Sequence, residues 1–269
     1  MSAPFEIGNF ILEPGKFIIC LNISLRTEAL HRSNVLASIF NVFSNYNISV
    51  MAVKTSASES RNSIKVTVFA DFTKNRKFLK KVVEDIKGLN YVKNVKIIEP
   101  LFNGLTMDTS YTYLTLADDR AIILRKPIYE GFIKGFREKF GQVASSFLYH
   151  IGFEAGRKAY ESHLRIVGEA HRGVEKIIPF ARELFKQVGF GILEFVKVDF
   201  INKTALIRVY NSFECELFKE TGMAESHFIR GLLAGFMSSL FDIKVDAEET
   251  KCIAKGDPYC EFVVGQKLW

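Results

Sequence analysis

The residues best suited to chemistry lie near the end of the chain, where two cysteines flank a turn. Cys252 and Cys260 stand on either side of Gly256-Asp257-Pro258. Because Gly, Asp and Pro favour chain reversal, two short strands joined there would bring both sulfurs together. An acidic pair, Glu248-Glu249, precedes the first cysteine, and thiolates beside carboxylates suit Zn²⁺ better than Mg²⁺ or Ca²⁺. The pattern predicts a zinc site, two packed thiols or a disulfide.

The composition is that of a globular protein with reduced thiols. The chain has 269 residues, 48% of them hydrophobic and 25% charged, which allows two domains of ordinary size. Its 25 phenylalanines indicate aromatic cores or a cavity lined by rings. Four cysteines are too few for a disulfide scaffold. The start of the chain lacks the pattern of a secretory signal, and no apolar run reaches the roughly 18 residues that span a bilayer. We therefore expect a cytoplasmic protein without a membrane span.

The charge distribution argues against direct nucleic-acid binding. The net charge is +6, which permits weak attraction to anionic surfaces. That excess is thinly spread, without a run of five or six like charges or a basic arm.

Residues 1–100 predict a domain with the order β-α-β-β-α-β. Strands are expected at 16–24, 48–56, 64–72 and 92–98, and helices from about 33 and from about 73 to 88. This order resembles the ACT-type regulatory domain, a ferredoxin-like fold that often binds small effectors and usually pairs with a second copy. Asn34 stands where amino-acid-binding ACT domains typically have a glycine. A role in dimerisation or docking is therefore at least as well supported as effector sensing.

Residues 101–269 predict a second domain of mixed α/β type, so that the fold class is α+β. A hairpin is expected around Asp118-Asp119. Helices are expected at 128–140, at 142–160, up to about 188 and at 228–240, and a strand pair at 190–200 and 204–210. The cysteine-bearing hairpin closes this domain.

Two of these helices carry glycines four residues apart, Gly152 with Gly156 and Gly231 with Gly235. Glycines at this spacing lie on one helix face and permit close approach by another helix or by a ligand. Tight packing between helices is the favoured interpretation.

The second domain resembles the 4-vinyl reductase domain over roughly residues 105–267. The segments that carry the resemblance follow one another in the family's order: Phe140-Gly141, residues 148–157, the Gly231/Gly235 helix and residues 249–262. Such domains are similar to sensor modules of aromatic-responsive bacterial transcription activators and to a protein linked to bacteriochlorophyll vinyl reduction. They are also similar to small subunits of the eukaryotic vesicle-tethering complex. The suggested architecture is an archaeal protein that joins an ACT domain to a 4-vinyl reductase domain.

The resemblance implies a set of metal ligands. In the zinc-containing sensors, a Glu three residues before the first Cys, both hairpin cysteines and an earlier Cys bind the metal. The first three correspond to Glu249, Cys252 and Cys260. Ser226 stands at the place of the earlier Cys, so we take the adjacent His227 as the fourth candidate ligand.

Two questions about this ligand set stay open at the level of sequence. Cys215, on the preceding segment, is the alternative fourth ligand. In a regular strand, Glu248 rather than Glu249 would share a face with Cys252, so the family assignment requires a bulge or bend. A metal with a full set of protein ligands would be structural, because no position is open for hydrolysis.

The family resemblance also implies an apolar cavity for a hydrophobic or aromatic small molecule. The candidate ligand-binding residues lie on the aromatic helices: Phe136, Phe147, Tyr149, His150 and Phe153. His150 is the best candidate for a polar contact inside the cavity, with a satisfied structural histidine as the alternative.

Taken together, these patterns favour a non-catalytic sensor or regulator. No nucleophile–base pair, dinucleotide-binding motif or P-loop is apparent. We expect the second domain to bind the small molecule, and the ACT-like domain to mediate homodimerisation or to pass a signal to a regulatory protein partner. The alternatives are a reductase or carrier for a vinyl-bearing tetrapyrrole, and a scaffold protein.

Overall fold

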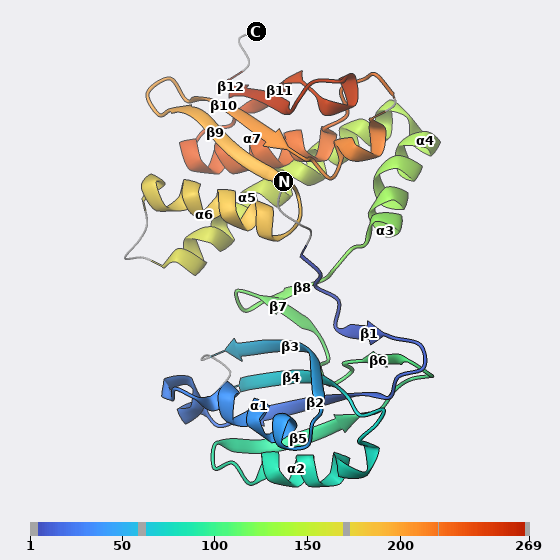
Figure 1. The fold of residues 1–269 in the computed structure, drawn as a ribbon. Coiled ribbons are helices and arrows are strands. Elements are labelled where there is room, and N and C mark those ends of the chain that lie inside the picture. The colour runs from blue at the N-terminus through green and yellow to red at the C-terminus, as the bar shows by residue number, and fades with distance from the viewer. Residues whose placement is uncertain (1–4, 59–62, 169–172, 220, 267–269) are drawn as a thin grey trace. The chain divides into compact units, whose positions relative to one another are not determined.

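The computed structural model describes residues 5–58, 63–168, 173–219 and 221–266, and the chain forms two compact units that divide at residues 122/123 (Figure 1). Each unit has its own antiparallel four-stranded sheet and its own hydrophobic core. Within the described ranges, no helix is long and apolar enough to cross a membrane.

The first unit has the predicted β-α-β-β-α-β order, with a sheet in the order β3-β4-β2-β5. Its main elements are β2 (Ile18–Leu25), η1 (Thr27–His31), α1 (Val35–Asn45), β3 (Ser49–Ser58), β4 (Ser63–Asp71), η2 (Arg76–Phe78), α2 (Leu79–Lys87) and β5 (Val92–Ile98). Strand β2 lies between β4 and β5 and is buried on both faces. Its alternate residues Ile19, Leu21 and Ile23 belong to the larger core with α1 and α2.

The opposite face of this sheet holds a smaller core of Ile18, Cys20, Phe69 and Ile98, and a second ribbon lies against it. Strand β1 (Phe10–Leu12) pairs there with β6 (Leu105–Met107). The Thr106 hydroxyl donates to the carbonyl oxygen of Ile18 over 2.6 Å. These contacts attach residues 105–107 to the first unit, and the two compact units therefore divide later in the chain than residues 100/101.

The predicted hairpin around Asp118-Asp119 is present, but it belongs to the first unit. Strands β7 (Leu114–Leu116) and β8 (Asp119–Ala121) pair across Ala117 and Asp118. These two turn residues have φ values of 49° and 66°, as a two-residue turn of the primed type requires.

The second unit combines a sheet in the order β11-β12-β10-β9 with long helices (Figure 1). Its elements are α3 (Lys126–Glu130), η3 (Gly131–Gly135), α4 (Phe136–Phe140), α5 (Gln142–Val167), α6 (Val174–Gln187), β9 (Ile192–Asp199), β10 (Thr204–Tyr210), η5 (Cys215–Phe218), α7 (His227–Phe241), β11 (Asp246–Lys251), η6 (Ile253–Lys255) and β12 (Cys260–Gly265). Inward-facing residues Cys260, Phe262 and Val264 alternate along β12 and share one core with α6 and α7.

Helices α5 and α7 cross with their backbones in contact, which confirms the predicted tight packing of the glycine pairs. A Cβ atom added to Gly152 would collide with the carbonyl oxygen of Phe228, and one added to Gly156 would lie 2.7 Å from the amide nitrogen of Phe236. The contact is reciprocal, because a Cβ on Gly231 would lie 2.8 Å from the carbonyl carbon of Tyr149. Only glycine fits at these positions of the crossing.

Candidate functional site

Four side chains that could hold a metal ion meet in the second unit. Cys215, Glu249, Cys252 and Cys260 each offer one ligand atom, and these atoms all lie within 4.8 Å of one another. Cys215 begins η5, Glu249 lies on β11, Cys252 follows β11 and Cys260 begins β12. Two segments that are distant in sequence, η5 and the β11–β12 hairpin, therefore contribute to one cluster.

The three sulfur atoms have a spacing that suits a small tetrahedral ion. The Sγ atoms of Cys252 and Cys215 are 3.4 Å apart, and those of Cys260 and Cys252 are 3.9 Å apart. Sulfurs bound tetrahedrally at the usual Zn–S distance would be separated by about 3.8 Å. All three thiols are free and fully buried. The donor set thus fits Zn²⁺ in both chemistry and size.

The hairpin that carries the two predicted cysteines is built by its turn residues. Gly256 has φ +95°, a conformation that favours glycine. Asp257 then turns back, and its carboxylate accepts a hydrogen bond of 2.8 Å from the backbone N–H of Cys252. This contact holds Cys252 beside Cys260 at the mouth of the hairpin.

Glu249 reaches the cluster through the irregularity that the sequence analysis requires. The register of β11 against β12 shifts between Glu249 and Lys251, as a β-bulge does. Glu248 is exposed, whereas Glu249 is partly buried and lies with the thiols. Ser226 donates to the Glu249 carboxylate through its hydroxyl over 2.6 Å and through its backbone N–H over 3.1 Å. Burial raises the pKa of Glu249 to about 8.

Ser226 also links the carboxylate to the third thiol. Its Oγ lies 2.7 Å from the Sγ of Cys215. The pKa values of these two neighbouring thiols shift in opposite directions. Hydrogen bonding with Cys215 lowers the pKa of Cys252, and the same contact raises the pKa of Cys215. Ser226, which stands where the family has a cysteine, thus contacts two candidate ligands, Cys215 and Glu249.

A second buried carboxylate, which the sequence analysis missed, lies at the start of α7. Both oxygens of Glu214 accept backbone hydrogen bonds of 2.8 Å, one from Phe228 and one from Ile229. The side chain therefore satisfies two of the free N–H groups of the first helical turn and places an acidic group at its positive end. Complete burial raises the pKa of Glu214 to about 7. The sequence around Glu214 does not indicate that this residue caps a helix, because α7 begins more than ten residues later.

His227, the expected fourth ligand, does not belong to the cluster, and Cys215 takes its place. The His227 Nε2 atom lies 3.5 Å from a carboxylate oxygen of Glu225, which is also paired with Arg137. Burial and the positive charges of Arg137 and Arg230 lower the pKa of His227 to about 4. His227 begins α7 and contacts Glu225, whereas Cys215 contacts the Cys252 thiol from η5.

The structure places the five predicted ligand-binding residues in different surroundings. Phe147 and His150 are exposed. Phe136 is partly buried, with ring centroids 4.8 Å from Phe140 and 5.7 Å from Phe147. The Tyr149 hydroxyl donates to Asp246 over 2.8 Å, and burial raises the pKa of Tyr149. Phe153 lines a pocket.

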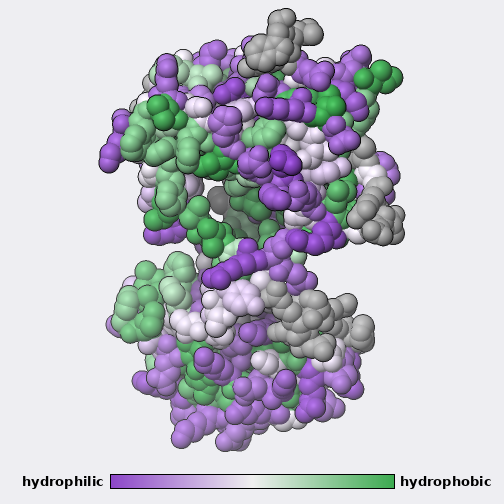
Figure 2. Space-filling view, turned by 180° about the vertical axis from the view of Figure 1, so that it is seen from behind, coloured by the Kyte–Doolittle hydropathy of each residue, from purple (hydrophilic) through white to green (hydrophobic). Residues whose placement is uncertain are grey.

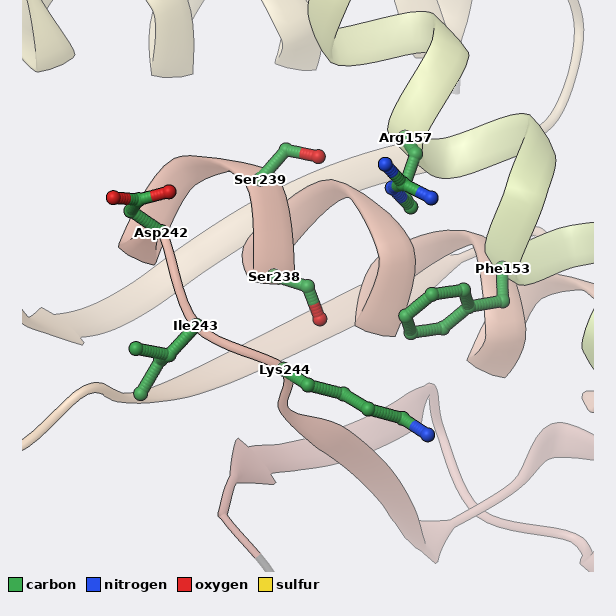
Figure 3. Close-up of a pocket in the computed structure, with 7 residues that line it drawn as sticks. All are labelled: Phe153, Arg157, Ser238, Ser239, Asp242, Ile243 and Lys244. Atoms are coloured by element: carbon green, nitrogen blue, oxygen red, sulfur yellow. The ribbon is translucent and has the colours of Figure 1, made fainter.

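That pocket has a volume of about 380 Å³ and lies between α5 and the end of α7 (Figure 3). Its lining combines one aromatic ring and one aliphatic side chain with polar and charged groups: Phe153, Arg157, Ser238, Ser239, Asp242, Ile243 and Lys244. The Ser238 hydroxyl is already engaged, since it donates to Ala234 and accepts from the backbone of Val245. Arg157 and Lys244 supply the positive charge at this opening.

Comparison with known proteins places both units in families. Residues 206–266 match the model of the 4-vinyl reductase domain and residues 21–96 match that of an ACT domain. An uncharacterized protein of Methanocaldococcus jannaschii is 33% identical over 117 residues, which cover 44% of this chain and 62% of that protein. The chain therefore spans less than two thirds of that relative.

A solved structure gives the same fold for the second unit. The phenol-responsive sensory domain of the transcription activator PoxR, in complex with phenol, has 18% identity and a TM-score of 0.50, and covers 56% of this chain and 78% of that one. A vinyl-4-reductase family protein from Methanocaldococcus jannaschii has 23% identity and a TM-score of 0.39, and covers 55% and 85%. The two domain types fit a sensory or regulatory role. The chain contains an ACT domain followed by a 4-vinyl reductase domain.

Proposed function

We propose that this protein is a non-catalytic, ligand-sensing regulator whose 4-vinyl reductase domain binds a hydrophobic or aromatic small molecule. The observation that carries the proposal is the match to this domain family together with a fold like that of a phenol-responsive sensory domain. The ACT domain, a regulatory type of fold, would pass the signal to a protein partner or to a second copy of the chain. A homodimer located in the cytoplasm is part of this proposal.

The pocket beside Phe153 is the proposed point of ligand contact. Its ring and the Ile243 side chain offer an apolar surface, and Arg157 and Lys244 offer partners for a polar or anionic group on the ligand. A phenol or a small aromatic acid has both properties. Tyr149, whose ring centroid lies 6.4 Å from that of Phe153 on the same helix, would stabilise this wall.

Native mass spectrometry of the purified protein and thermal unfolding with phenol or benzoate as probes test this proposal. We expect a retained small molecule or a raised unfolding midpoint of the 4-vinyl reductase unit. Phe153→Ala should weaken probe binding about fivefold, because the lost ring contact is worth about 1 kcal/mol. Ile201→Ala is the matched control, since Ile201 is 91% exposed and is not among the residues that line the pocket. Absence of both a bound molecule and a midpoint shift would contradict the sensing role.

We also propose that Cys215, Glu249, Cys252 and Cys260 hold one structural Zn²⁺. The support is the donor chemistry, the complete burial of the thiols and the separations of their sulfurs. With all four ligands from the protein, the ion would fasten η5 to the β11–β12 hairpin rather than activate water.

Metal analysis distinguishes this ligand set from the one expected from sequence. Zinc measured by inductively coupled plasma mass spectrometry should approach one ion per chain and fall strongly in Cys215→Ser. His227→Gln should retain it, because His227 contacts Glu225 instead. Cys20→Ser is the control for removal of a buried thiol, since Cys20 lies in the core of the other unit. Full zinc occupancy in Cys215→Ser would exclude the proposed set.

A further inference from the structure

One segment of the first unit accounts for the whole net charge of the chain. Residues 74–96 hold eight basic and two acidic side chains, so that their net charge of +6 equals that of all 269 residues. The remainder of the chain is therefore electrically balanced. Six of the eight cations lie on η2, on α2 or just before η2: Lys74, Arg76, Lys77, Lys80, Lys81 and Lys87. We name these six residues the η2–α2 face.

Helix α2 gathers these cations on its outer side. Its apolar residues Val82, Val83 and Ile86 are buried in the core of the first unit, and all six cations are exposed. In Figure 2, hydrophilic residues cover the lower end of this unit, at the level where Figure 1 places α2. The buried residues separate the cations along the sequence, which is why no long run of like charge appears there. Helical spacing of three or four residues brings them together.

The cations of the η2–α2 face are not compensated by ion pairs. Among the residues that the structure describes, none of the six has a carboxylate oxygen within 4.0 Å. By contrast, Lys158 and Lys219 of the second unit each pair with a glutamate three residues away. Of the two acidic residues on α2, Asp85 accepts a hydrogen bond of 2.7 Å from the Tyr46 hydroxyl. Glu84 is thus the one carboxylate of α2 without such a partner in the described residues.

The face offers charge without an apolar anchor. Three of its cations lie over aromatic rings, at 3.8 Å for Arg76 over Phe17, 5.1 Å for Lys77 over Phe78 and 6.0 Å for Lys81 over Tyr46. Residues 73–90, all of which the structure describes, include no exposed large hydrophobic side chain. The centre of a protein interface is depleted of Lys and carries apolar or aromatic anchors. Binding of single-stranded nucleic acid uses exposed rings on which bases stack.

We propose that the η2–α2 face binds the phosphate backbone of double-stranded nucleic acid without reading its sequence. Lys and Arg side chains that neutralise phosphates release counterions, and this release supplies sequence-independent affinity. Residues 77–87 span about 15 Å at about 1.5 Å per residue. One strand of a duplex carries about four phosphates over that length, at about 3.4 Å each, so the cations and the phosphates are similar in number.

A lipid surface fits this face less well than a duplex does. A helix that lies on a membrane turns its apolar side toward the lipid, whereas Val82, Val83 and Ile86 face the protein core. Direct nucleic-acid binding was not expected from the sequence because no long run of like charge is present. That criterion does not apply to a face that helical periodicity assembles. The inference goes beyond the proposed sensing role and does not rest on it.

Fluorescence anisotropy with a DNA duplex of about 20 base pairs and an RNA duplex of the same sequence tests this proposal. With about five phosphate contacts, affinity for the wild-type chain should fall about 500-fold between about 50 and 200 mM salt. Lys80→Gln combined with Lys87→Gln removes about two contacts, so the fall should be about 40-fold. Lys158→Gln combined with Lys219→Gln is the matched control, because it removes two exposed charges from the second unit and should behave as wild type.

Circular dichroism should show that all variants fold like the wild type, because Gln and Lys have similar helix propensities. Binding of one duplex alone would support the proposal and identify DNA or RNA as the source of the phosphates. Failure of both duplexes to bind at the lower salt concentration would overturn it, and so would an unchanged salt dependence in the α2 variant or an equal loss in the control. Tighter binding of polyglutamate than of either duplex would also overturn it, in favour of an acidic protein. Unfolding with phenol or benzoate tests the sensing role separately.

Discussion

Replacing Gly235 by alanine tests how strongly the α5–α7 crossing contributes to the stability of the 4-vinyl reductase unit. The added Cβ would collide with the carbonyl oxygen of Phe153 and would lie 2.7 Å from its carbonyl carbon and 3.0 Å from its Cα. All three are backbone atoms, so no side-chain rotation relieves the overlap. Ordinary contact begins near 3.4 Å, and the two helices would have to separate by about 1 Å.

The expected cost combines two opposing effects. Overpacking of a tight core costs about 3 kcal/mol, and exchange of glycine for alanine inside a helix returns about 1 kcal/mol. Gly235→Ala should therefore lower the free energy of unfolding of the 4-vinyl reductase unit by about 2 kcal/mol. Urea unfolding followed by circular dichroism, fitted with a separate transition for each unit, measures this change.

Gly131→Ala is the matched control for this measurement. A Cβ on Gly131 meets no atom within 4 Å, so the same exchange should stabilise the unit by up to about 1 kcal/mol. If Gly235→Ala were as stable as Gly131→Ala, the backbone contact between α5 and α7 would not restrict side-chain size, and the packing argument would be wrong.

Three further predictions concern buried polar groups and the metal. Burial lowers the pKa of His163 to about 4 from 6.5. The contribution of neutral His163 to the free energy of unfolding is therefore fully present above pH 6.5. It declines by at most about 3 kcal/mol as the pH falls to 4, because the unfolded chain takes up the proton first. Urea titrations across this range should show the decline, and His163→Phe should flatten it. Glu214→Ala should cost about 2–4 kcal/mol, since it leaves the N–H groups of Phe228 and Ile229 without acceptors; an unchanged urea midpoint would contradict this role. Removal of zinc by a chelator should lower the thermal midpoint of the 4-vinyl reductase unit by roughly 5–10 °C while leaving the ACT unit unchanged, and equal shifts in both units would argue against a local structural ion.

The sequence predicted most of the secondary structure because its patterns are local. The strand at Thr204–Tyr210 and the helix at His227–Phe241 follow directly from alternation and from helical periodicity. Cys252 and Cys260 were found from the turn between them, whereas Glu249 was taken from the resemblance to the 4-vinyl reductase domain. That resemblance also required the bulge beside Glu249, because regular alternation would have directed this side chain away from Cys252.

What the sequence could not supply depended on contacts between distant segments. Cys215 joins Cys252 across 37 residues, so its selection over His227 required the positions of η5 and α7. His150 was expected inside a cavity because aromatic residues surround it in sequence. Periodicity identifies an apolar side of a helix, yet it does not distinguish a side that faces a core from one that remains exposed.

The crossing of α5 and α7 has a mechanical consequence for signalling. Packed helices usually adjust to a ligand by sliding a small distance over their side chains. Here the backbones interlock, with Gly152 against Phe228 at one point and Gly235 against Phe153 at another. We therefore expect α5 and α7 to move together as one rigid body. A displacement at the start of α7, where Ser226 contacts Cys215 and Glu249 of the thiol cluster, would therefore also move α5.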